Sequence, residues 1–123
     1  MPTTPVILLA QEVEGPDRAV IATDAKGLVI YWGTGAEGMF GWTRDEVLGR
    51  SIVDVTPTEV TRELATSILE TLLEGHPWSG EFQVRGKNGE RFDARVTDIP
   101  VHDKAGELLG IVGISRRKGH LDR

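Results

Sequence analysis

The chain has 123 residues, no cysteine and a net charge of −5. This length fits one domain, and the absence of cysteine excludes a disulfide framework, a thiolate nucleophile and a cysteine-ligated metal site. The acidic balance and the short apolar runs argue against nucleic-acid binding and membrane insertion. With no visible secretory signal, we expect a cytoplasmic domain.

The first element is an N-terminal flank at residues 1–17, punctuated by prolines and containing one apolar run at residues 6–10. The length of this run fits a short helix or an edge strand, and its periodicity does not decide between them. Residues 19–23 and 28–32 then predict two strands, rich in β-branched and aromatic residues. The tight turn between them, at residues 24–27, ends on Gly27, which can adopt a positive φ.

Three helix starts follow, each marked by a capping box in which Thr precedes Glu by three residues. The boxes begin at Thr34, Thr43 and Thr56. Interrupting glycines keep the first two helices short. The third, with Pro57 at its first position, can be long, because apolar residues recur at helical spacing from residue 60 until Gly75.

The remaining sequence predicts three strands, at residues 78–85, 92–101 and 108–114, with a hairpin turn at residues 87–89. Even-numbered apolar residues give way to odd-numbered ones at Ile99 and Val101. A bulge near Asp98 and Pro100 would explain the change, and we expect it to turn Asp98 to solvent. Unbroken parity would instead aim this side chain inward.

This order predicts an α+β fold, a five-stranded antiparallel sheet with helices inserted between strands two and three and covering one face. The motifs resemble the PAS (Per-Arnt-Sim) family over residues 16–117. The resemblance is carried by IATDAKG at 21–27, Tyr31-Trp32 with GAEGMFG at 35–41, WTRDEVLGR at 42–50, PWSGE at 77–81 with KNG at 87–89, and GIVGIS at 110–115.

Two departures from the family pattern affect the expectations. The family usually has Asn after the Tyr-Trp pair, whereas this chain has Gly33, so we expect Thr34 to cap the first helix. The family often ends in Asp-Ile-Thr, whereas Ser115 is followed here by Arg-Arg-Lys. The resemblance implies a sensory domain at residues 18–117, with a polar tail at residues 118–123 leading toward an output region.

The resemblance implies that the domain controls an effector of a larger signalling protein. The regulation would be of the two-component, kinase or phosphatase type. Flavin adducts and covalent chromophores of this family need a cysteine, which the chain lacks. Haem needs an axial histidine in the long helix, whereas His76, His102 and His120 are separated and lie outside it. We therefore expect no metal, and we argue against flavin and haem, with Trp78 as either a flavin contact or a structural anchor.

An apolar cavity between sheet and helices is the remaining candidate site, for a small apolar or amphipathic guest such as a fatty acid or an aromatic. Arg91 and Arg95 have the opposite parity to the inward residues, which argues against a small-acid sensor. The alternative is a core that these side chains simply fill. The candidate ligand-binding residues are Phe40, Leu48, Ile52, Leu64, Ile68, Trp78, Gly80, Phe82, Val84, Ala94 and Val96.

A ligand-free interaction module is the second functional hypothesis. The apolar run of the flank would then form a homodimer interface through Val6, Ile7, Leu8 and Leu9, or dock an effector in the same or another chain. A small enzyme is the third hypothesis. No catalytic residues are identified, because the serines lack a nucleophile-elbow context and the glycines do not form a phosphate loop.

Overall fold

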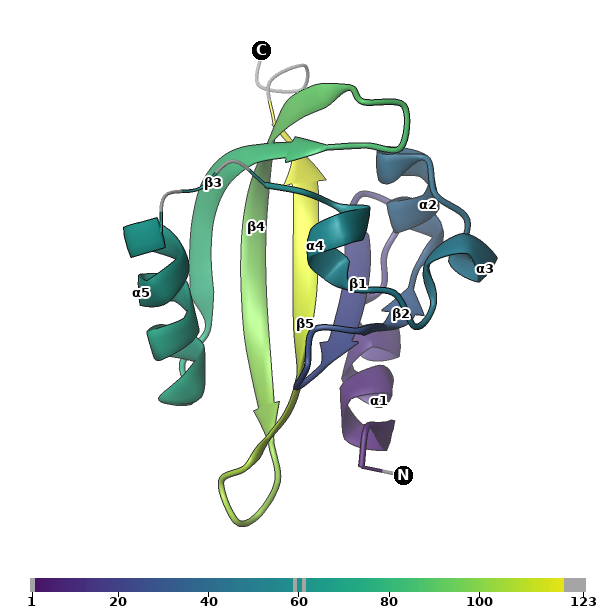
Figure 1. The fold of residues 1–123 in the computed structure, drawn as a ribbon. Coiled ribbons are helices and arrows are strands. Elements are labelled where there is room, and N and C mark those ends of the chain that lie inside the picture. Colours follow the sequence, from purple (N-terminus) through teal and green to yellow (C-terminus); the bar gives the residue numbers. More distant parts are fainter. Residues whose placement is uncertain (1, 59, 61, 119–123) are drawn as a thin grey trace.

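The computed structural model describes residues 2–58, 60 and 62–118, which form a five-stranded antiparallel sheet in the order β2-β1-β5-β4-β3 (Figure 1). The α+β architecture predicted from the sequence is confirmed. The strands are β1 (Ala19–Asp24), β2 (Val29–Trp32), β3 (Trp78–Arg85), β4 (Arg91–His102) and β5 (Leu108–Arg117). The helices are α1 (Thr4–Val13), then α2 (Thr34–Phe40), α3 (Arg44–Val47), α4 (Ile52–Val55) and α5 (Arg62–Leu73) between β2 and β3.

The turn between β1 and β2 forms as the sequence predicts. Gly27 has a φ of +86°, and the Asp24 carboxylate accepts hydrogen bonds from the backbone N–H groups of Lys26 and Leu28 at 2.9 and 3.0 Å. An aspartate that bonds its own turn in this way stabilises the reversal. The turn sets the register that pairs Ile21 with Trp32.

The inner face of the sheet packs against α2, α3 and α4 around three aromatic rings. Trp32 and Phe40 lie 5.8 Å apart between ring centroids, and Phe40 lies 5.8 Å from Phe92. The Trp32 indole also donates a hydrogen bond of 2.9 Å to the carbonyl of Trp42. These contacts join β2, α2 and β4, so this end of the sheet is the main core.

The outer face of the sheet carries a second core beneath α1. Val6 and Ala10 of α1 are fully buried against Val20, Ala22 and Val112. The flank is therefore a helix, the first of the two forms left open by its sequence. Figure 1 shows α1 on the side of the sheet away from α4. Gly110 permits this close approach, because a side chain there would collide with the carbonyl of Thr23 and crowd Val6.

The bulge expected near Asp98 and Pro100 is absent. The register of β4 against β5 runs without interruption from residue 94 to Val101, and its irregularity lies between Val101 and His102. Ile99 and Val101 are apolar because they pack in the outer core beneath α1. The change in apolar parity thus marks a second buried face, and Asp98 stays on the inner face.

Two of the three expected helix caps are corrected by the structure. Thr43 forms a complete capping box with Glu46. At α2, however, the cap is Gly33, and Thr34 is the first helical residue. Thr56 ends α4, where its hydroxyl donates to the carbonyl of Ile52 at 3.3 Å, so Pro57 does not begin a helix. The sequence reading missed α4, and Glu59 lies outside the described residues.

Gly33 also has a role in joining α1 to the sheet. A Cβ at this position would overlap the carboxylate of Glu14, which follows α1. Glu14 accepts a hydrogen bond of 2.8 Å from the Tyr31 hydroxyl. Burial and this bond to Glu14 raise the pKa of Tyr31 to about 12. The glycine that replaces the family's usual asparagine therefore makes room for a contact between α1, β2 and the start of α2.

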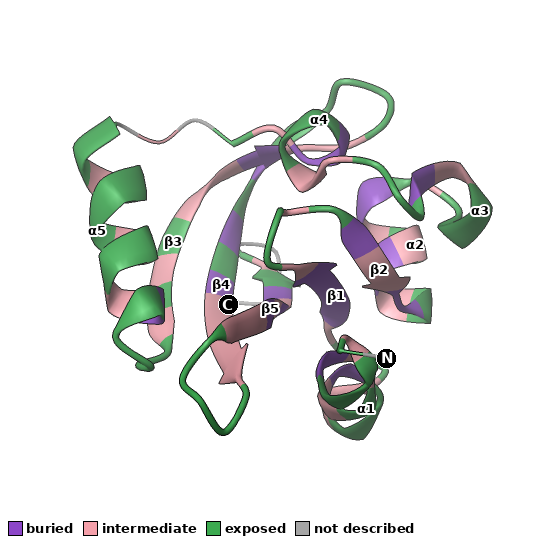
Figure 2. Cartoon of the chain, turned by 60° about the horizontal axis from the view of Figure 1, so that its bottom comes forward, coloured by how far each residue is buried: buried purple, intermediate pink, exposed green. Residues whose placement is uncertain are grey.

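Helix α5 lies beside β3 instead of covering the middle of the sheet (Figure 1). Leu72 is its one buried residue among those described, and Leu69 and Leu73 are exposed. Figure 2 shows this helix mostly in the exposed class. The sequence predicted that the apolar stripe of this helix would close over the sheet, but the helices that pack on the inner face are α2, α3 and α4.

The outer core gives a matched test of α1 packing. Val6→Ala removes two fully buried methyl groups, and we expect it to lower the free energy of unfolding by about 2 kcal/mol. Leu8→Ala, on the same helix but 58% exposed, should change it by less than about 0.5 kcal/mol. Urea unfolding monitors both variants, and equal effects would contradict the docking of α1 described above.

Candidate functional site

A pocket of about 260 Å³ opens on the inner face of the sheet, between the central strands and α4. It is smaller than the roughly 300–1,000 Å³ of most small-molecule pockets. A cavity of roughly 150 Å³ is enough to admit benzene. The residues that line the pocket are Ile21, Thr23, Phe40, Ile52, Val53, Thr56, Thr58, Phe82, Val84, Val96, Asp98, Ile111, Gly113 and Ser115.

The pocket floor is a row of residues that crosses the sheet. Asp98 of β4 pairs with Gly113 of β5, and Gly113 pairs with Ile21 of β1. Because paired residues of neighbouring strands share a face, these three lie on the face of the sheet toward the helices. The glycine in this row leaves open the space beside the Asp98 carboxyl, since a Cβ at Gly113 would lie 3.1 Å from Asp98 Oδ1.

Asp98 is a carboxyl group in apolar surroundings. It has no hydrogen bond or ion pair with any residue that the structure describes. Burial disfavours its charged form and raises its pKa from 3.8 to about 6. The side chain is therefore mostly ionised at neutral pH, without a partner that would offset the cost of removing the charge from water.

Five of the eleven candidate ligand-binding residues line this pocket: Phe40, Ile52, Phe82, Val84 and Val96. The other six lie outside it. Leu48 is exposed after α3, Leu64 and Ile68 are on α5, and Ala94 is fully buried in the core. Trp78 folds over Gly80, where its ring would collide with any Cβ, and lies 5.9 Å from Phe82 between ring centroids.

Sequence reasoning missed the polar part of the pocket and the contribution of β1 and β5. Thr23 and Ser115 are buried hydroxyl residues in its lining. Alternation along the last strand could have identified Ile111, Gly113 and Ser115 as a set. The signal for Asp98 was its even position in β4, which it shares with the inward-facing Val96. The expected bulge led to the opposite prediction, that Asp98 faces solvent.

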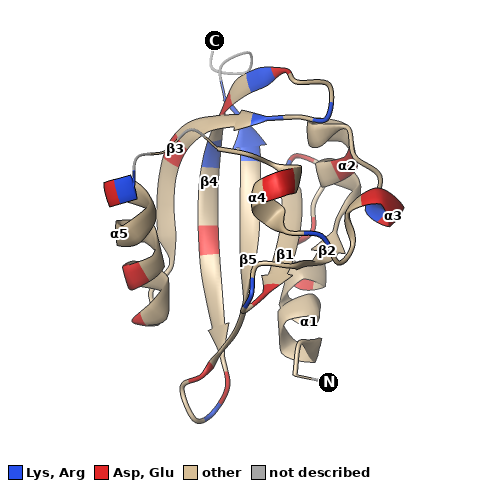
Figure 3. Cartoon of the chain, viewed as in Figure 1, with Lys and Arg blue, Asp and Glu red and all other residues tan. Residues whose placement is uncertain are grey.

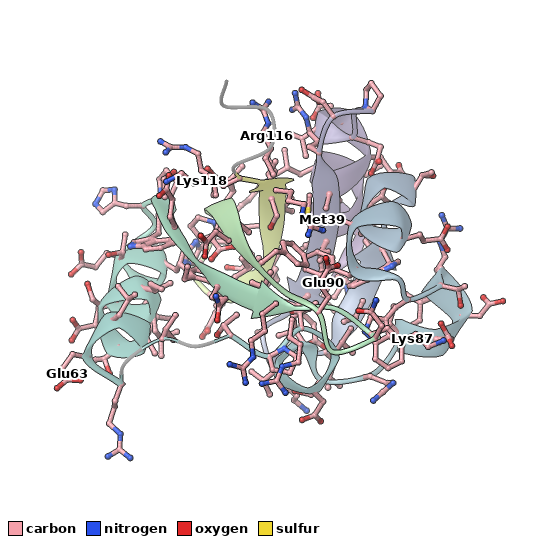
Figure 4. All side chains as sticks on the ribbon, turned by 90° about the horizontal axis from the view of Figure 1, so that it is seen from above. Met39, Glu63, Lys87, Glu90, Arg116 and Lys118 are labelled. Carbon is pink, nitrogen blue, oxygen red and sulfur yellow. The ribbon has the colours of Figure 1, made fainter. Side chains whose placement is uncertain are left out.

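A larger concavity, of about 520 Å³, lies at the end of the sheet where β5 finishes. Figure 3 shows Lys and Arg gathered at this end of β4 and β5, and Figure 4 shows Met39, Arg116 and Lys118 around it. Its cations are ion-paired at the surface: Arg95 and Lys118 with Glu81 at 3.2 and 2.7 Å, and Arg116 with Asp17 at 3.5 Å. These pairs leave the inner pocket as the better candidate for a ligand.

No three side chains of the types that bind metals converge within the described part of the chain. No helix in that part is long and apolar enough to cross a membrane. His76 and His102 lie outside the lining of the inner pocket, and His120 is outside the described residues.

The fold is a five-stranded antiparallel sheet with helices on both faces, and comparison with known proteins gives its family. The PAS fold model matches residues 8–117. The chain belongs to the PAS family, whose members are sensory domains of signalling proteins. The resemblance seen in the sequence motifs is thereby confirmed.

Curated relatives share this segment as a small part of longer proteins. The human high affinity cAMP-specific and IBMX-insensitive 3',5'-cyclic phosphodiesterase 8A is 25% identical over 104 residues, which are 85% of this chain and 12% of that protein. The nitrogen fixation regulatory protein of Klebsiella oxytoca is 24% identical over 104 residues, 85% of this chain and 21% of that protein. The chain thus spans about an eighth to a fifth of these relatives.

Solved structures share the fold. A PAS domain from Colwellia psychrerythraea superposes with a TM-score of 0.78 at 19% identity, covering 93% of this chain and 97% of that one. The blue-light activated histidine kinase of Erythrobacter litoralis EL346 gives a TM-score of 0.70 at 18% identity, covering 87% of this chain and 35% of that one. These similarities establish the architecture alone.

The environment of Asp98 predicts a pH-dependent stability. Between pH 4 and pH 6 the native state binds more protons at this residue than the unfolded state does, so the free energy of unfolding falls as pH rises. Above pH 6 the full penalty, about 3 kcal/mol, remains. We expect Asp98→Asn to become more stable relative to the natural chain by about this amount between pH 4 and pH 7.

Urea unfolding of both proteins across this pH range measures the difference directly. Because only the difference between the two proteins is used, the other titrating groups cancel. Parallel stability curves would show that the Asp98 carboxyl is not desolvated in the native state.

Proposed function

We propose that this PAS domain is the sensor of a larger signalling protein, and that it binds one small apolar or amphipathic molecule in the inner pocket. The observation that carries the proposal is the open volume between α4 and the sheet, lined by two phenylalanines and several aliphatic side chains. Burial of a ligand's apolar surface there supplies the binding free energy. The size of the pocket suits a guest of one or two rings.

The strand β5 offers a route from the pocket to the outer face. Ile111, Gly113 and Ser115 of this strand line the pocket, and Val112, between them, is buried beneath α1. A ligand that prefers one position of β5 would therefore also favour one position of α1. Regulation of an effector requires such a difference in affinity between two arrangements.

Interaction with a second copy is the other functional candidate, and one observation favours it. Leu8 is 58% exposed on α1, next to partly exposed Ile7 and Leu9. Val6, expected from the sequence to lie in the same interface, is instead buried against the sheet of its own chain. We therefore propose that a homodimer, if formed through α1, uses the side of the helix that contains Leu8.

A filled pocket provides the test of the sensor proposal. We expect native mass spectrometry of the purified chain, mixed with the neutral compound naphthylethanol, to show one small molecule per chain. Val96→Phe places a ring in the pocket and should weaken this binding at least about tenfold, because the displaced volume is what the guest would occupy. Ile111→Phe, which crowds the pocket from β5, should act in the same direction.

Leu69→Phe on the exposed part of α5 is the matched control and should bind as the natural chain does. Circular dichroism confirms that each variant folds. If no small molecule binds, or if the filled variants bind as well as the control, the sensor proposal fails. A ligand-free dimer that Leu8→Glu dissociates would then favour the interaction module.

A further inference from the structure

Asp98 distinguishes this pocket from a simple apolar cavity. Among the described residues that line the pocket, Asp98 alone carries a charge. Its carboxyl has no hydrogen-bond or ion-pair partner among the described residues, and it lies beside Gly113, which has no side chain. A partly buried carboxylate without a partner in an apolar pocket is costly, so its presence points to a cationic group that binds it from outside the chain.

Within the described part of the chain, no group of opposite charge faces Asp98 from the elements packed around it. β3 presents Trp78 opposite Asp98, β5 presents Gly113, and α4 contributes Ile52 and Val53 to the lining. The acidic residues of α4 and α5 are exposed and do not line the pocket. The described lining of the pocket therefore has a negative charge at its floor and no cation.

We propose that the pocket binds a small apolar amine, with its ring or alkyl part between α4 and the sheet and its ammonium group on the Asp98 carboxylate. This inference rests on the proposed sensor function and adds the chemical class of the ligand. An ammonium group would form a charge-assisted hydrogen bond with the carboxylate. It would also offset the cost of holding that carboxylate out of water, which is largest above pH 6.

The walls of the pocket fit the same class of ligand. Phe40 and Phe82 both line it, and aromatic rings attract cations through their negative faces. A fatty acid, which the sequence left open as a guest, would bring its own carboxylate into a pocket that already contains one. Two like charges at such a site repel each other. The charge of Asp98 thus selects against the acid and for the amine.

Three compounds that share a two-ring apolar part and differ in charge provide the test. Naphthylethylamine is a cation, naphthylethanol is neutral and naphthylacetate is an anion. We expect calorimetry at pH 7.5 to show that the natural chain binds the amine about 10- to 100-fold more tightly than the alcohol, and the acid most weakly. Asp98→Asn, which keeps the shape but removes the charge, should abolish the advantage of the amine.

Asp98→Ala is the second variant. It controls for a new hydrogen bond that the amide of Asp98→Asn could make with the ligand, and it should lose the preference for the amine in the same way. In the natural chain the amine should also bind more weakly at pH 5, where Asp98 is protonated, and Asp98→Asn should not show this change. Equal affinity for amine and alcohol in the natural chain, with Val96→Phe still blocking both, would overturn the amine proposal and leave the sensor proposal standing. Binding of none of the three would overturn both.

Discussion

Strands β4 and β5 carry apolar side chains on both faces, since odd residues of β4 such as Ile99 pack beneath α1 while even residues such as Val96 face α2 to α4. A sheet with two apolar faces must be covered on both sides. The helices between β2 and β3 cover the inner face, and α1 covers the outer face. The long β4–β5 pair therefore contributes to both cores. A ligand that displaces these strands from the inner face would also change their packing against α1.

Residues that lack a side chain determine where the layers approach each other. Gly110 lets Val6 of α1 reach the sheet, and Gly33 admits the Glu14 carboxylate beside the start of α2. On the inner face, by contrast, no helix in the described part of the chain fills the space that Gly113 leaves, and its missing side chain contributes open volume next to Asp98. Close contact on one face and free space on the other thus arise from glycines only a few residues apart on the same strand.

The five strands and their hairpin turns could be predicted from the sequence, because alternation and turn residues are local signals. The Thr43 capping box was predictable for the same reason. What could not be predicted depends on tertiary contacts. The parity change at Ile99 suggested a bulge, because the sequence alone does not show that α1 covers a second face. The apolar stripe of α5 suggested a lid, but its position beside β3 is set by packing that no local pattern encodes. As a result, nine of the fourteen described residues that line the pocket, Asp98 among them, were not among the candidates.

The chemistry of the inner pocket centres on one carboxyl group, that of Asp98, which faces a small apolar space. Its most direct test is an NMR titration of the Asp98 side-chain carboxyl carbon, with and without saturating naphthylethylamine. We predict a midpoint near pH 6 in the free chain and a lower midpoint with the amine, because the bound cation favours the ionised form. A free midpoint near the ordinary value of 3.8, unchanged by the amine, would contradict the account, since the carboxyl would then lie in water.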